Sequence, residues 1–194
     1  MAGSKNAILW TCNDNKDFIL KTVNSVKSAK KNGVDADCFV MVQTKYKEEI
    51  AHMKQMLDGI DRIFGFVPDV DLHAMREGQT LVELTNFLLS EMTKVLEQYQ
   101  PDCTVVHGDT TTALAAAMAS FYAHIPVAHV EAGLRTGNME SPFPEEFNRK
   151  TIDSIATLLF APTEKDYRHL QDEQVALTHA SVTGNTEIDA LAYT

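Results

Sequence analysis

Three short segments of the sequence carry acidic residues that could exchange protons with a substrate. Asp109 follows one apolar run, Glu131 follows another, and Glu145 and Glu146 follow a proline-rich turn. Because the carboxyl ends of parallel strands meet at one edge of a sheet, we expect these segments to lie together. Carboxylates gathered in an enclosed site shift one another's pKa values and can divide the roles of general acid and general base. The pattern therefore predicts proton-transfer chemistry.

Each acid also has a purely structural interpretation. Asp109 or Thr110 would cap the helix that begins there, since Asp and Thr are common N-cap residues. Glu131 would form a surface ion pair with Arg135, which contributes little to stability. The two acids of the third segment would complement a helix dipole. The occurrence of all three segments at the ends of strands in one sheet favours the chemical interpretation.

The elements that must position these acids alternate along the chain. Apolar runs predict strands over residues 7–12, 38–42, 60–66, 103–106, 125–130, 157–161 and 180–183. Spacings of three and four predict helices up to residue 31, over 46–57, 80–99, 110–121 and 145–155, from Thr163 onward, and after 186. Strand–helix alternation of this kind predicts an α/β protein with a doubly wound, mostly parallel, Rossmann-like sheet.

Composition excludes several function classes. The 194 residues carry 17 Lys and Arg against 27 Asp and Glu, and the net charge of −10 argues against a nucleic-acid partner or an anionic membrane surface. No apolar run could span a membrane and the N-terminus lacks the apolar core of a signal peptide, so we expect a cytoplasmic protein. The widely spaced cysteines predict neither disulfides nor a metal site. His107 and His129 are expected to be buried histidines rather than ligands or bases.

Four motifs together resemble one enzyme family. They are His107-Gly-Asp-Thr-Thr, Glu131-Ala-Gly-Leu-Arg-Thr-Gly, Pro144-Glu-Glu-Phe-Asn-Arg and Gly184-Asn-Thr-Glu-Ile-Asp-Ala-Leu191. In their order and spacing, from about Asp69 to Leu191, the chain resembles the non-hydrolysing UDP-N-acetylglucosamine 2-epimerases. The hydrolysing branch of the family has a different signature at these loops.

The resemblance implies one half of an enzyme with two Rossmann-like domains in the GT-B arrangement, usually a homodimer. Such enzymes interconvert UDP-N-acetylglucosamine and UDP-N-acetylmannosamine. UDP is eliminated across C1 and C2 to leave a 2-acetamidoglucal, and is then added back with a proton on the other face of C2. This route needs a base, a proton donor and a closed pocket, but no cofactor.

The same resemblance assigns roles to individual residues. Asp109, Glu131 and Glu145 match the family's catalytic acids, and the carboxylate that removes the proton in each direction is left open because their titrations would be coupled. The matching substrate-binding residues, two of which are supporting cations, are Arg135, Glu146 and Arg149.

Two regions depart from the family pattern. The loop after the first predicted strand lacks the family's Gly-Thr-Arg-Pro-Glu, which grips the nucleotide phosphates. Lys16 and Lys21 are expected to bind substrate in place of the family's Arg and Lys, although Lys lacks the planar bidentate fork. Gln43 only partly matches a region associated with an allosteric substrate molecule, whereas Arg76 and Gln79 fit that neighbourhood.

The length makes one domain the default and leaves two small domains possible, and the resemblance implies a single Rossmann-like domain over residues 1–194. The family's second domain, which normally holds uridine and diphosphate and supplies a further catalytic histidine, is expected to be absent. We therefore expect little or no epimerase activity from the chain alone, and a second copy or a chain supplying that domain as its partner. One alternative is a non-catalytic descendant that binds, regulates or dimerises with a full-length epimerase. A GT-B glycosyltransferase domain is a further alternative, which the acidic loops disfavour.

Overall fold

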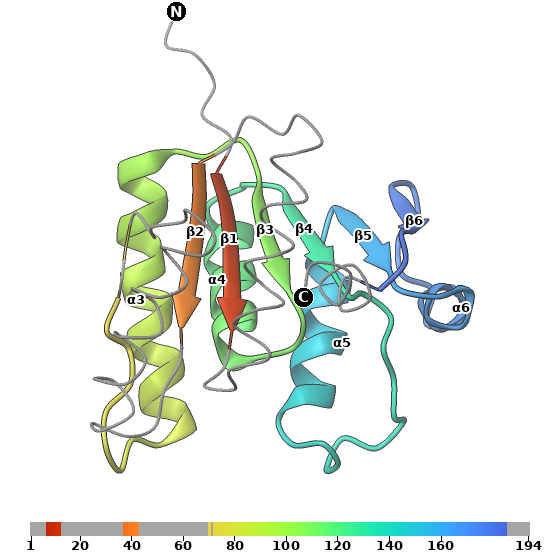
Figure 1. The fold of residues 1–194 in the computed structure, drawn as a ribbon, viewed down its shortest axis with the longest axis horizontal. Helices are drawn as coiled ribbons and strands as arrows, with labels where there is room; N and C mark the ends of the chain where they lie inside the picture. The colour runs from red at the N-terminus through yellow and green to blue at the C-terminus, as the bar shows by residue number, and fades with distance from the viewer. Residues whose placement is uncertain (1–6, 13–36, 43–69, 71, 186–194) are drawn as a thin grey trace, which may run out of the picture.

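Four strands form one parallel sheet, and two further strands lie beside it (Figure 1). The computed structural model describes residues 7–12, 37–42, 70 and 72–185. The strands are β1 (Ala7–Cys12), β2 (Asp37–Val42), β3 (Thr104–His107), β4 (Val127–Val130), β5 (Leu158–Ala161) and β6 (Ala180–Val182). β1 pairs with β2, and β3 to β6 pair in chain order, every pair being parallel. Because β1 lies next to β3, the strand order changes direction between them, which is where such sheets bind ligands.

The helices pack around this sheet as an α/β fold requires. They are α3 (Leu81–Tyr99), α4 (Thr111–Tyr122), α5 (Glu145–Ile155) and α6 (Glu164–Asp172). α4 packs on β1, β3 and β4 with α3 and α5 on either side of it, while α6 lies against β5 and β6 (Figure 1). The predicted α/β class with a parallel sheet is confirmed. The strand predicted over 60–66 and the helices predicted up to 31, over 46–57 and after 186 lie outside the described residues.

α3 begins and packs as its sequence predicts. The Thr80 hydroxyl accepts the Glu83 N–H at 3.2 Å, and the Glu83 carboxylate accepts the Thr80 N–H at 2.8 Å, which completes a capping box. Along the helix, Leu84, Leu88 and Met92 form one buried face. This apolar face anchors α3 to α4 and so builds the core away from the acidic segments.

α4 is built largely of alanine. Ala113, Ala115, Ala116 and Ala117 are fully buried between the sheet and the neighbouring helices. Because an alanine side chain ends at Cβ, this helix can approach both closely. The packing fixes the start of α4 directly after the segment that contains Asp109.

β4 is shorter than predicted. The Ile125 N–H donates to the Ser120 carbonyl at 2.9 Å, which ties Ile125 to the end of α4 rather than to the sheet. Pro126 has no N–H to donate, so regular pairing begins at Val127. By contrast, the helix predicted over 145–155 has those bounds in the structure.

Candidate active site

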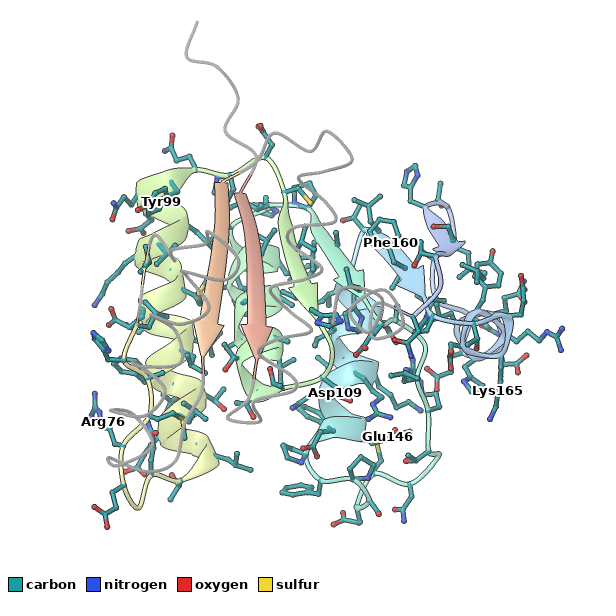
Figure 2. All side chains as sticks on the ribbon, in the orientation of Figure 1. Arg76, Tyr99, Asp109, Glu146, Phe160 and Lys165 are labelled. Atoms are coloured by element: carbon teal, nitrogen blue, oxygen red, sulfur yellow. The ribbon has the colours of Figure 1, made fainter. Side chains whose placement is uncertain are left out.

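The strand register brings the acidic segments to one edge of the sheet. His107, the last residue of β3, lies opposite Val130, the last residue of β4, and Val130 lies opposite Phe160 of β5. The segments that follow these strands therefore leave the sheet side by side. Figure 2 shows Asp109 from the first segment and Glu146 from α5 at this edge.

Asp109 binds a guanidinium from α5. Arg149 donates to Oδ2 of Asp109 from Nε at 3.0 Å and from Nη2 at 2.5 Å, and Asn148 donates to the Asp109 carbonyl at 2.7 Å. Burial raises the pKa of Asp109, the Arg149 charge opposes part of this, and the negative charges of Glu131 and Glu145 raise the pKa further, so that it lies above its ordinary value. The three acids singled out by the sequence are thus close enough to act on one another's charge.

Thr110, rather than Asp109, caps α4. Its hydroxyl accepts the Ala113 N–H at 3.1 Å. The capping interpretation therefore holds for Thr110 alone. The Asp109 carboxylate faces Arg149 instead, so its position needs another explanation than helix capping.

Glu131 has an unusual backbone conformation. Its φ of +70° lies in the left-handed region, which costs a non-glycine residue on the order of 1 kcal/mol and is concentrated at functional sites. The side chain is 13% exposed, and its Oε1 lies 3.5 Å from Nε2 of the buried His107. Arg135 binds Asp153 and Glu173, which gives no support to the alternative of a Glu131–Arg135 ion pair.

Glu145 and Glu146 are neighbours with different environments. Glu146 is fully buried and accepts the N–H groups of Thr136 and Gly137, the latter at 2.9 Å. Burial raises the pKa of Glu146, but these N–H groups and Arg149 outweigh it, so the pKa lies below its ordinary value. Glu145 is half-buried and acts on Asp109. The structure therefore engages Glu146, predicted to bind substrate, in holding the segment after β4.

Asp153 on α5 links two of the acidic segments. Its Oδ1 lies 2.6 Å from Nδ1 of His129, whose Nε2 lies 2.9 Å from the Gly108 carbonyl. Its Oδ2 accepts the Gly133 N–H at 3.0 Å and lies 2.8 Å from Nη1 of Arg135. His129 and Asp153 are both fully buried, which confirms the expectation of a buried histidine at 129.

Arg135 is held by a second carboxylate at the end of α6. Its Nε and Nη2 donate to Glu173, the latter at 2.7 Å, and Lys150 Nζ lies 2.7 Å from the same carboxylate. The hydrogen bonds from Arg135, opposed by burial and assisted by Lys150, lower the pKa of Glu173 from 4.5 to about 2. Arg135 was predicted to contact substrate, and in the structure it binds the carboxylates of Asp153 and Glu173 and the Leu134 carbonyl.

Gly133 lets the segment after β4 pass under α6. Its φ is +84°, and a Cβ there would lie 2.2 Å from the Asp166 carbonyl oxygen. The His169 ring contacts the Gly133 carbonyl through Nδ1 at 2.8 Å. No residue with a side chain fits without displacing backbone, so Gly133 is required by the contact between this segment and α6.

The sequence prediction missed Asp153 and Glu173. A usable signal was present for Asp153, because Glu146, Arg149 and Asp153 recur at helical spacing on the face of α5 that contains Ile152. This buried face is charged, whereas Phe147 is 48% exposed. Charged residues that share a helix face with a buried isoleucine indicate a buried network of hydrogen bonds and ion pairs.

Two of the remaining predicted residues, Arg76 and Gln79, lie away from this edge. Arg76 and Gln79 line a surface hollow beside the start of α3, where the Arg76 guanidinium lies 5.0 Å from the centroid of the Phe87 ring. Figure 2 shows Arg76 well apart from Asp109. Lys16, Lys21 and Gln43 lie outside the described residues.

Neither a metal-binding group nor a membrane-spanning helix occurs in the part of the chain that the structure describes. No group of three or more His, Cys, Asp or Glu residues there could hold a metal ion. Within the same residues, no helix has the length and apolar character needed to cross a membrane.

Comparison with known proteins gives a consistent result along most of the sequence. A family model described as UDP-N-acetylglucosamine 2-epimerase matches residues 50–194. The UDP-N-acetylglucosamine 2-epimerase of Escherichia coli (strain K12) is 48% identical over 143 residues, which is 74% of this chain and 38% of that protein. The chain thus spans about 38% of the length of the curated relatives it matches.

Solved structures extend this likeness to the fold. A crystal structure of UDP-GlcNAc 2-epimerase from Neisseria meningitidis bound to UDP-GlcNAc superposes with a TM-score of 0.81 and 38% identity, covering 96% of this chain and 48% of that one. Acinetobacter baumannii MurG superposes with a TM-score of 0.54 and 9% identity, over 92% of this chain and 45% of that one, which is a likeness of fold alone. The fold is therefore a Rossmann-like α/β unit of the GT-B type.

Proposed function

Since this chain belongs to the UDP-N-acetylglucosamine 2-epimerase family, we propose that its carboxyl-edge acids catalyse proton transfer at C2 of a UDP-N-acetylhexosamine. The reaction interconverts UDP-N-acetylglucosamine and UDP-N-acetylmannosamine. The observation that carries this proposal is the grouping of Asp109, Glu131 and Glu145, in which burial and the other two charges raise the pKa of Asp109. A carboxyl group that keeps its proton to higher pH is suited to giving and taking one.

The proposed chemistry proceeds in two balanced steps. A carboxylate removes the C2 proton as the C1–O bond to UDP breaks, which leaves a 2-acetamidoglucal and UDP. A phosphate oxygen of UDP then adds to C1, and a carboxylic acid returns a proton to the opposite face of C2. Two protonation states are needed at one site, and acids that act on one another's charge supply them.

The same geometry favours the sugar end of the substrate over the diphosphate end. A diphosphate needs cations, and the guanidinium groups of Arg135 and Arg149 are already bound to Asp153, Glu173 and Asp109. We therefore propose that groups other than these two arginines bind the diphosphate, and that efficient turnover depends on them.

The oligomeric state and the cellular location are part of the same proposal. We propose that the active form is a homodimer or a complex with a chain that supplies the UDP-binding half, and that it works in the cytoplasm. UDP-GlcNAc is the proposed substrate because the Neisseria meningitidis relative was solved bound to it. Light scattering with and without UDP-GlcNAc would test the assembly.

A chimera tests the catalytic assignment. This chain replaces the matching segment of the Escherichia coli relative, and deuterium incorporation at C2 of UDP-GlcNAc is followed in D2O by NMR. We expect incorporation by the chimera, and a loss of about 100-fold or more in Asp109→Asn, Glu131→Gln or Glu145→Gln. Glu97→Gln, an exposed change on α3, is the matched control and should be silent. Unchanged rates in all three acid variants would refute the assignment.

The chain alone provides the complementary measurement. We expect it to show little or no deuterium incorporation, because Arg135 and Arg149 are already bound to protein carboxylates. Binding of UDP-GlcNAc without exchange, in both the chain and the chimera, would favour a non-catalytic binding role instead. Robust turnover by the chain alone would show that groups within this chain suffice to bind the diphosphate.

A further inference from the structure

The ring of His129 lies between two oxygen atoms beneath the acidic edge. Nδ1 lies 2.6 Å from Oδ1 of Asp153, and Nε2 lies 2.9 Å from the Gly108 carbonyl. A carbonyl oxygen and an ionised carboxylate can only accept hydrogen bonds. A neutral imidazole has one N–H and would leave one contact without a proton, whereas an imidazolium has two and satisfies both.

The surroundings of Asp153 keep its carboxylate ionised. Oδ2 accepts the Gly133 N–H at 3.0 Å and lies 2.8 Å from the guanidinium of Arg135. A protonated Asp153 paired with a neutral His129 would face Arg135 with less charge in a fully buried site. Although burial raises the pKa of Asp153, His129 and Arg135 outweigh it and hold the pKa below its ordinary value.

Three groups that face His129 favour its positive charge. Asp153 faces it from α5, the Gly108 carbonyl from the segment after β3, and Glu131 from the end of its own strand. Burial lowers the pKa of His129, but these three outweigh it and the pKa lies above its ordinary value.

The pair of His129 and Asp153 connects the two backbone segments that follow β3 and β4. Gly108 precedes Asp109, and Gly133 lies two residues after Glu131. We propose that His129 is a permanently protonated positioning residue that, with Asp153, fixes the segment carrying Asp109 relative to the segment carrying Glu131. This positioning role rests on the proposed function, because catalysis would require a fixed separation between Asp109 and Glu131.

The protonation state is measurable in the unmodified chain. Long-range ¹H–¹⁵N NMR of the histidine rings, with His129→Asn used to assign the signal, should show both His129 nitrogens protonated from about pH 5.5 to about pH 8.5. A neutral His129 ring at about pH 7 would overturn the inference.

A test of the positioning role needs a measured quantity that would not change if His129 only stabilised the fold. The titration of the Asp109 carboxyl carbon is that readout, and we expect its midpoint to move by at least about half a pH unit in His129→Asn. His124→Asn, at the end of α4, is the matched control and should leave the midpoint in place. An Asp109 midpoint that is the same in His129→Asn as in the natural chain would overturn the inference.

A second variant covers the case in which the first does not fold, and the measurements do not depend on the substrate. If His129→Asn does not fold, Asp153→Glu keeps the anion while changing its reach, and the same midpoint criterion applies to it. Neither measurement uses the substrate, so a failure here is distinct from a failure of the proposed function, which the deuterium experiment tests separately.

Discussion

Asp109 and Asp153 are two aspartates at the same edge of the sheet, and each binds an arginine, yet their pKa values move in opposite directions. Asp153 receives hydrogen bonds from His129, Gly133 and Arg135, which outweigh its burial and lower its pKa. For Asp109, burial outweighs Arg149, and neighbouring negative charges add to the rise. The number of donors around a buried carboxylate thus separates one that holds the structure from one that can exchange a proton.

Glu146 and Glu173 share the lowered pKa of Asp153. We refer to Asp109, Glu131 and Glu145 as the edge carboxylates, and to Glu146, Asp153 and Glu173 as the anchored carboxylates. Each anchored carboxylate has its pKa lowered by named donors, chiefly backbone N–H groups, His129, Arg135 or Lys150. On α5, Glu146 and Asp153 hold the segment after β4, whereas the proposed function assigns catalysis to Glu145.

Asp153→Asn is expected to have the largest effect on stability. The amide leaves the charges of His129 and Arg135 without their buried anion, and breaking a buried ion pair costs about 3–5 kcal/mol. Asp109→Asn should change the free energy of unfolding by about 1 kcal/mol or less, because its carboxylate is partly exposed and, among the described residues, the hydrogen bonds it accepts come from Arg149 alone. Urea unfolding followed by circular dichroism measures both.

Asp172→Asn, an exposed change in the last turn of α6, is the control and should stay within about 0.5 kcal/mol of the natural chain. Equal losses in Asp109→Asn and Asp153→Asn would remove the distinction between the two sets of carboxylates.

The neighbours Glu145 and Glu146 sharpen the comparison. In Glu146→Gln, the N–H groups of Thr136 and Gly137 lose their charged acceptor and donate to a neutral amide oxygen instead. We therefore expect a loss of about 2 kcal/mol in the free energy of unfolding. Glu145→Gln should leave stability within about 0.5 kcal/mol while abolishing exchange in the chimera. A result with the two roles reversed would contradict the division.

Much of the fold was predictable because it depends on local pattern. The Leu84, Leu88 and Met92 spacing and the Thr80 cap predicted α3, and continuous apolar runs predicted the strands of the sheet. The end of β4 nearest Pro126 was misjudged, since an apolar run does not reveal that Ile125 bonds back to α4.

The site was predictable only in part. Asp109 and Glu131 follow strands, so the topology alone brings their segments to one edge. The roles of Asp153 and Glu173 depend on contacts 24 and 38 residues apart in the chain, which no spacing rule specifies. Glu146 and Arg135 were assigned to substrate by resemblance, and a sequence does not show the backbone N–H groups that bind Glu146 or the carboxylates that bind Arg135.

Glu173→Gln is expected to have the smallest effect and a distinctive dependence on pH. Hydrogen bonds from Arg135, opposed by burial and assisted by Lys150, lower the pKa of Glu173 from 4.5 to about 2. A lowered pKa in the folded state means that the stabilisation is present above about pH 4.5 and is lost as the pH falls toward about 2. Because the carboxylate is partly exposed, we expect a loss of only about 1 kcal/mol at neutral pH in Glu173→Gln. The unfolding free energies of the two chains should converge in acid, and a difference that stays constant from neutral pH down to about pH 2 would mean that the charge of Glu173 does not contribute to stability.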